Sequence, residues 1–218
     1  MPYEYCCFVS YPHGQDDVLV PFVNDFVTGL EREIKTQTYK KVWSDKFLKG
    51  GHRVDEEIGP DLCKSACMIL FYTPLYFDTE HTYCARELKA MQDLEEQRMQ
   101  TIKDKGKGLI IPVILRGVKR FPLSLKEKRK YWDFTRKLLN REKDTIQEMY
   151  AQEISEIAEY ILDQCDLLEQ DTQQVPHNCE AYRLPSAEDA KTFVETVIGR
   201  KIVAVPMEFP VRPSETDS

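Results

Sequence analysis

Short apolar runs alternate along the chain with longer stretches whose apolar residues recur every three or four positions. Each run has the length of a buried β-strand, and the runs occupy residues 5–11, 66–72 and 109–115. Two further strands are expected at residues 40–44 and 130–134, which are less apolar. The stretches between them have the spacing of amphipathic helices, and they cover residues 19–34, 54–62, 83–102 and 146–168. The chain is therefore expected to alternate between strand and helix.

This alternation predicts an α/β fold with a doubly wound, parallel, five-stranded sheet of the flavodoxin-like type. Right-handed crossovers place the loops after residues 11, 44 and 72 at one rim of the sheet, where open α/β sheets bind ligands. Pro112 lacks a backbone donor, which predicts an irregularity in the fourth strand or a place near the edge of the sheet.

The last fifty or so residues have a different pattern. We expect one domain over residues 1–169 and a C-terminal extension of unknown role over residues 170–218. Within the extension, Ser186 and Asp189 have the spacing of a variant capping box, which predicts a helix start. The expected parts are a linker, that helix and a further strand, at residues 173–178, 186–197 and 202–205.

Composition and charge disfavour some classes of function for this chain. The net charge of −7 argues against a nucleic-acid binder, which usually has a basic face. No apolar run approaches the ~20 residues that span a bilayer, and the first residues lack the features of a signal peptide. We therefore expect a cytoplasmic protein that contacts neither nucleic acid nor membrane.

The cysteines agree with that expectation. Of the seven, Cys6, Cys7, Cys67 and Cys84 lie in or beside apolar runs, where a reduced thiol acts as a small hydrophobe. Cys63 and Cys67 have no nearby histidine, and no CxxC pair occurs, so no zinc site is predicted. Reduced thiols favour a reducing compartment.

The most informative stretch is Tyr83-Cys84-Ala85-Arg86-Glu87, which follows the third strand and opens a helix. At ~100° per residue, Cys84 and Leu88 lie on one apolar face, and Glu87 lies at its edge. A carboxylate at this place is either a site residue in the rim cleft or a solvated glutamate near the helix dipole. Cys84 has two corresponding interpretations, a thiol of lowered pKa or a packing residue, and its apolar face favours packing.

The motifs, taken in order, resemble the Toll/interleukin-1 receptor (TIR) domain family. Its first box has the pattern F-x-S-Y, its second R-D-x-x-P-G, and a later W-C-x-x-E-L opens the third helix. The matching segments here are Phe8-Val9-Ser10-Tyr11, Ser44-Asp45 with Gly50-Gly51, and Tyr83-Cys84-x-x-Glu87-Leu88. The resemblance covers residues 1 to about 169.

The sequence departs from the family pattern at three positions. Ser44 replaces the arginine of the second box, and Gly50 stands where proline often occurs. That proline is associated with adaptor-type signalling domains, so its absence weakens an adaptor interpretation. Tyr83 replaces tryptophan and keeps an aromatic face, while Glu87, the position used by NAD-cleaving members, is present.

The resemblance implies an NAD+ nucleosidase, of glycohydrolase or ADP-ribosyl cyclase type, that releases nicotinamide from NAD+ as substrate. Breaking the nicotinamide–ribose bond develops oxocarbenium-like charge on the ribose. The leaving group departs neutral, so one carboxylate, Glu87, suffices as the catalytic group. The expected substrate contacts are Ser10, Tyr11, Asp45, Phe47 and Tyr83, with core packing or loop capping as the competing interpretation of each.

The resemblance also implies self-association through the loop at residues 45–51. The chain resembles prokaryotic members of the family that are used in antiviral defence. In those members NAD+ is depleted or converted to a nucleotide signal, and the expected partner is an upstream sensor or a downstream effector protein. The alternative hypothesis is a non-catalytic interaction or scaffold module. A receiver-like domain is a weaker alternative, because the expected acidic cluster and lysine are missing. No GxGxxG or P-loop occurs, so hydride transfer and nucleotide triphosphate hydrolysis are not expected.

Overall fold

A five-stranded, all-parallel sheet forms the centre of the molecule, in the order β2-β1-β3-β4-β5. The computed structural model describes residues 3–13, 19–44, 54–78, 80–100, 102, 108–135, 150–170 and 178–199. The strands are β1 (Tyr5–Ser10), β2 (Lys41–Trp43), β3 (Ser65–Tyr72), β4 (Ile110–Ile114) and β5 (Trp132–Asp133). This is the flavodoxin-like arrangement expected from the sequence.

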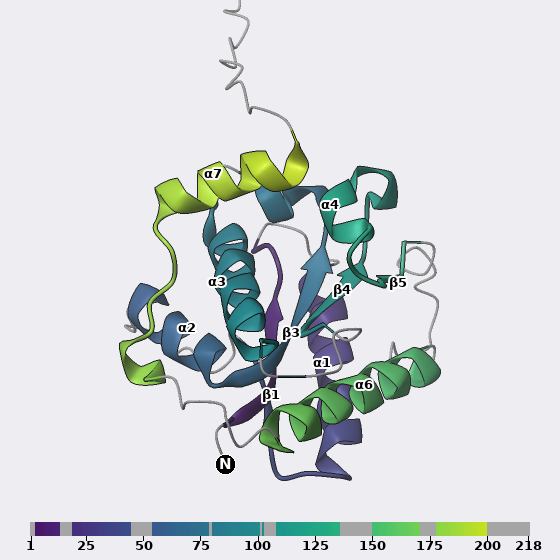
Figure 1. The fold of residues 1–218 in the computed structure, drawn as a ribbon. Coiled ribbons are helices and arrows are strands. Elements are labelled where there is room, and N and C mark those ends of the chain that lie inside the picture. Colours follow the sequence, from purple (N-terminus) through teal and green to yellow (C-terminus); the bar gives the residue numbers. More distant parts are fainter. Residues whose placement is uncertain are drawn as a thin grey trace, which may run out of the picture.

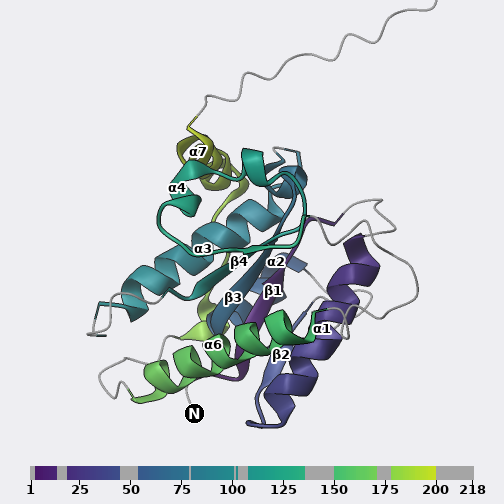
Figure 2. The ribbon, with the colours of Figure 1, turned by 90° about the vertical axis from the view of Figure 1, so that its right-hand side faces the viewer.

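Helices cover both faces of the sheet (Figures 1 and 2). One face carries α1 (Leu19–Lys35) and α6 (Ala151–Gln170), and the other carries α2 (Val54–Cys63) and α3 (Tyr83–Arg98). Every residue of the central strand β3 is buried, which explains why its sequence is a continuous apolar run instead of an alternating one.

The buried faces of the helices have the predicted spacing. In α1 the buried side chains include Phe22, Phe26 and Leu30. Phe22 and Phe26 meet Phe71 of β3 edge-on, with ring centroids 6.5 and 5.1 Å apart. Edge-to-face aromatic contacts of this kind add to the free energy of burial, so α1 is anchored directly on the central strand.

Pro112 lies in β4 next to the edge strand. Val113 and Ile114 pair with the two residues of β5, and the Ile114 carbonyl accepts a hydrogen bond from Phe134 N. N–H groups two residues apart in a strand point the same way, so an N–H group at position 112 would point toward β5, as that of Ile114 does. The pairing with β5 begins only after position 112, at Val113. The prediction of a place near the edge is confirmed.

Most element boundaries agree with the sequence analysis within two residues, which is the usual uncertainty of such boundaries. The fifth strand is shorter than predicted and comprises Trp132 and Asp133 alone. The helix that carries Glu87 ends at Arg98 instead of near residue 102, and the chain turns there so that Ile102 is buried. The predicted strand at 202–205 lies outside the described residues.

The C-terminal extension crosses the outer side of α2 and α3 (Figure 1). We call its described part, residues 178–199, the strap. The strap contains a 3-10 turn, η4 (Cys179–Ala181), and the helix α7 (Ala187–Ile198), which packs on α3 and on α4 (Leu123–Lys126). The predicted capping box at Ser186 and Asp189 is present and starts α7.

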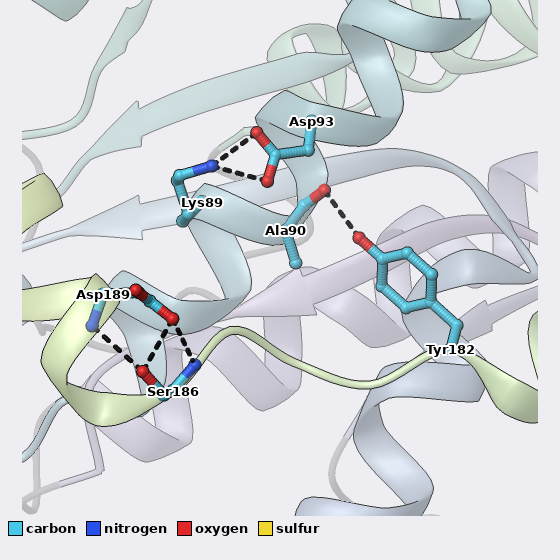
Figure 3. Close-up of polar contacts among 6 residues, drawn as sticks. All are labelled: Lys89, Ala90, Asp93, Tyr182, Ser186 and Asp189. Atoms are coloured by element: carbon cyan, nitrogen blue, oxygen red, sulfur yellow. Dashed lines mark hydrogen bonds and ion pairs between the residues drawn. The ribbon is translucent and has the colours of Figure 1, made fainter.

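Several bonds attach the strap to the domain. Cys179 forms a disulfide with Cys63 at the end of α2, and Glu180 pairs with Lys64 at 2.7 Å. The Tyr182 hydroxyl donates to the Ala90 carbonyl of α3 at 3.2 Å, as Figure 3 shows. Five other cysteines are free and buried, including the four expected to act as small hydrophobes. The disulfide was not expected from the sequence.

Candidate active site

Glu87 lies in the second turn of α3, on the side of the helix that faces the sheet. Its side chain is almost fully buried, with 8% of the residue surface exposed. One carboxylate oxygen, Oε2, accepts a hydrogen bond from the Ser10 hydroxyl at 2.6 Å. Ser10 is the last residue of β1, so the bond joins the start of α3 to the carboxyl end of a central strand. Of the two interpretations of Glu87, the solvated glutamate does not fit this burial.

Tyr76 is a third polar side chain at this place, and together with Ser10 and Glu87 it forms what we call the cluster. The Tyr76 hydroxyl lies 2.6 Å from Ser10 Oγ, and the whole residue is buried. Tyr76 belongs to η2 (Pro74–Phe77), the 3-10 turn that directly follows β3. Thr73 caps this turn by accepting a hydrogen bond from Leu75 N, and Pro74 begins it. The local sequence therefore sets the direction in which Tyr76 points.

Sequence reasoning did not select Tyr76. The available signal was its place in the loop after residue 72, which was one of the three loops predicted to meet at the rim. The segment Pro-Leu-Tyr-Phe is mostly apolar, and its sequence does not indicate that the tyrosine hydroxyl forms a hydrogen bond in the site. The partner, Ser10, lies 66 residues away in the chain.

The electrostatics of the cluster keep its phenol and its thiol neutral. Burial first, and then the neighbouring Cys84 and Glu87, raise the pKa of the Tyr76 phenol well above its usual value. Burial first, and then the charge of Glu87, raise the pKa of the Cys84 thiol well above its usual value. Both groups are therefore protonated near neutral pH. Cys84 is a packing residue and not an activated nucleophile.

The other predicted site residues lie around this cluster. Tyr11 follows Ser10 and is buried, with its ring centroid 4.6 Å from that of His13. Tyr83 begins α3 and is 42% exposed, with the Arg86 guanidinium carbon 5.2 Å from its ring centroid. Asp45 and Phe47 lie outside the described residues. The structure thus brings Ser10 and Glu87 into contact and leaves Tyr83 accessible at the rim.

The second strand ends at the same rim. Trp43 pairs with Phe8 in the parallel register, and their rings stack with centroids 4.2 Å apart. Trp43 Nε1 also donates to Asp61 Oδ2 at 2.8 Å. Because β1 and β2 are parallel, the chain leaves β2 at the edge of the sheet where Ser10 ends β1. This is the edge where open α/β sheets bind ligands.

Comparison with known proteins then gives the family. A model of the TIR domain matches residues 8–150, which is more than half of the chain. The chain belongs to the TIR domain family. No curated protein is similar enough in sequence to match. TIR domains serve in signalling, as scaffolds that associate through their own surfaces or as enzymes that cleave NAD+.

The match places the cluster inside the TIR domain and the strap outside it. Ser10, Tyr76 and Glu87 all lie within residues 8–150, whereas α7 begins at Ala187. The strap is therefore an addition to the domain in this chain. Its packing on the outer side of α3 supports the helix whose inner side carries Glu87.

Three cavities formed by described residues lie away from the cluster, and none of these three is lined by Ser10, Tyr76 or Glu87. One of about 510 Å³ lies at the amino end of β4, between Gly108, Trp132 and Tyr160. That is the end of the sheet opposite to Ser10, so the cavity does not belong to this site. No group of three or more histidine, cysteine or acidic side chains in the described ranges could hold a metal ion. None of the described helices is long and apolar enough to cross a bilayer.

Proposed function

We propose that this TIR domain is an NAD+ nucleosidase that releases nicotinamide and an ADP-ribose product. The observation that carries the proposal is the Glu87 carboxylate, buried at the carboxyl edge of the sheet and held there by Ser10. It occupies the glutamate position of the family's aromatic-Cys-x-x-Glu segment, which begins here with Tyr83.

The proposed chemistry needs one negative charge near the ribose. As the bond to nicotinamide breaks, positive charge develops on the ribose, and a nearby carboxylate stabilises it. Burial strengthens this interaction, because charges attract more strongly where water is excluded. A carboxylate offers about four acceptor positions, so it can accept from Ser10 and from a ribose hydroxyl at the same time.

Aromatic side chains at the rim would bind the bases of the dinucleotide. Tyr83 is the best placed of the described residues, since it begins the helix of Glu87 and part of its ring is accessible. Tyr11 is buried in the core, so its contribution would be to shape the site from below. Phe47 and Asp45 remain predicted contacts. Product analysis by mass spectrometry would show whether the ADP-ribose product is linear, cyclised or base-exchanged.

The first test is release of nicotinamide from NAD+, measured by chromatography. We expect Glu87→Gln to lower the rate on the order of 10²-fold or more, because the amide cannot stabilise the developing charge. Glu96→Gln, an exposed position on the same helix, is the matched control and should retain the wild-type rate. Equal rates for Glu87→Gln and wild type would contradict the proposal.

A scaffold role is the second candidate, and exposed apolar side chains favour it. Leu75 in η2 and Tyr83 at the start of α3 are 61% and 42% exposed, close to the cluster in the chain. Exposed apolar side chains at such a place suit an interface with another protein. Wild-type protein that releases no nicotinamide at any concentration, yet self-associates, would support this candidate instead.

A further inference from the structure

Tyr76 joins the candidate site through a hydrogen bond of its hydroxyl. Its hydroxyl lies 2.6 Å from Ser10 Oγ, and Ser10 is its hydrogen-bond partner in the described part of the chain. The ring is buried beside Phe77, with centroids 5.2 Å apart in an edge-on contact. A phenylalanine ring would make the same packing contacts, so the hydroxyl must be explained separately. Burying a hydroxyl is unfavourable unless it forms a hydrogen bond.

The direction of the two hydrogen bonds follows from the number of hydrogens. Ser10 has one hydroxyl hydrogen, and it donates that hydrogen to Glu87 Oε2 at 2.6 Å. The bond between Ser10 and Tyr76 must then run the other way. The Tyr76 phenol is protonated near neutral pH, as its raised pKa requires, and it donates to Ser10 Oγ.

This arrangement restricts Ser10 to one orientation. A serine hydroxyl rotates freely unless both its hydrogen and its lone pairs are engaged. Here Tyr76 occupies a lone pair and Glu87 takes the hydrogen, while the Cys84 side chain also lies within hydrogen-bond reach of Ser10. Hydrogen bonds in such a chain strengthen one another. Tyr76 and the buried Cys84 thiol are two titratable groups beside Glu87, and both are neutral.

We infer that Tyr76 is a positioning residue for the candidate reaction, acting through Ser10 to hold the Glu87 carboxylate in one orientation toward the ribose. The inference rests on the proposed function, because it assigns a task to Glu87. It adds a residue from a third segment, the turn after β3, to a site otherwise built from the end of β1 and the start of α3.

The central test compares Tyr76→Phe with wild type by two measurements. The first is the ¹³C chemical shift of the Glu87 carboxyl carbon, assigned by its loss in Glu87→Gln. We expect this shift to change in Tyr76→Phe, because Ser10 Oγ loses the hydrogen bond from Tyr76 and keeps only its remaining contacts to fix its position beside Glu87. The second is the kinetics of NAD+ cleavage, in which kcat should fall by about 10-fold while KM changes by less than about twofold, since a positioning loss acts mainly on the transition state.

Tyr72→Phe is the matched control. Tyr72 is also a buried tyrosine beside this turn, but its hydroxyl donates to the Arg120 carbonyl at 2.9 Å and not to the cluster. Removing that hydroxyl should leave the Glu87 carboxyl shift unchanged. If both variants shift the signal equally, the effect is a general loosening of the core and the inference is wrong.

A double-mutant cycle tests whether the effect passes through Ser10. In a Ser10→Ala background, Tyr76→Phe should cause no further change in the carboxyl shift or in kcat, because the intermediate hydroxyl is gone. Full additivity of the two changes would overturn the inference. If Tyr76→Phe does not fold, a site-specific 3-fluorotyrosine at position 76 keeps the ring, alters the acidity of its hydroxyl and should still move the shift.

The two proposals fail differently. Absence of nicotinamide release by wild type removes the proposed function, while the carboxyl shift still measures the bond from Tyr76 through Ser10. Normal activity in wild type with an unchanged shift and an unchanged kcat in Tyr76→Phe removes the role of Tyr76 alone.

Discussion

Arg98 illustrates how one residue is understood only in its tertiary setting. By sequence it is a basic residue near the end of a helix, a place that usually faces solvent. In the structure it is 1% exposed, and its guanidinium donates to the carbonyls of Cys63, Ser65 and Ala66 at 2.6, 2.8 and 3.2 Å. Burial lowers its pKa. Arg98 therefore joins α3 to the connection between α2 and β3.

We expect Arg98→Met to destabilise the protein by on the order of 3 kcal/mol, because buried carbonyls lose a charged donor. Urea unfolding followed by circular dichroism measures this as a lower midpoint. Arg32→Met, at an exposed position in α1, is the control and should leave the midpoint nearly unchanged. The same midpoint in both variants would show that the three hydrogen bonds contribute little.

The individual site residues were partly predictable. Ser10 was selected because it ends a strand at the predicted rim, and Glu87 because it opens a helix there and occupies the glutamate position of the TIR motif. Tyr76 was not, since its role depends on a partner that the local pattern does not indicate. Tyr11 was predicted as a contact with packing as its competing interpretation, and its burial favours packing.

At the scale of elements, the strap is the least expected feature. Its helix α7 was predicted with its cap, but the surface that it covers could not be inferred from the sequence. Arg86 Nε, one residue before Glu87, donates to the Pro185 carbonyl of the strap at 2.7 Å. The Ser124 hydroxyl donates to the Val197 carbonyl at 2.9 Å. The strap thus bridges three elements of the domain and supports α3 from outside.

The disulfide to Cys63 should contribute to stability through the unfolded state, since it closes a sequence separation of 116 residues. We expect Cys179→Ser to cost about 2–5 kcal/mol under non-reducing conditions. Thermal unfolding with and without reductant measures this cost. Reductant should lower the midpoint of wild type and leave that of the variant unchanged, whereas an equal response in both would contradict a role for this bond.

The same bond bears on the predicted compartment. Disulfides are rare where thiols are kept reduced, so the prediction of a reducing, cytoplasmic setting did not anticipate this pair, and the compartment stays a prediction. Counting thiols in protein isolated with alkylating agent would give five if the bond is closed in the cell and seven if it is open.

At the scale of the whole molecule, the sheet brings the ends of β1, β2 and β3 to one rim. The loops that leave β1 and β2 there include residues 14–18 and 45–53, which lie outside the described residues. Self-association through residues 45–51 therefore stays a prediction. An open site excludes water only when something closes it, and a second copy of the chain is the predicted closure.

We accordingly expect the NAD+ cleavage rate per molecule to increase with protein concentration. A dilution series of wild type, compared with sedimentation velocity over the same range, measures this. The rate per molecule should rise where the sedimentation coefficient rises. A rate per molecule that is constant across the transition from monomer to oligomer would show that each chain carries a complete site.

By itself, the sequence determined the succession of strands and helices along the chain, the parallel sheet and the place of Glu87 at the edge of an apolar helix face, because periodicity and capping act over a few residues. Only the tertiary structure decided the contact of Ser10 with Glu87 and Tyr76, the burial of Arg98 and the path of the strap. These contacts join residues up to 116 positions apart. They depend on strand order and crossover, which set which segments become neighbours and which short-range patterns do not specify.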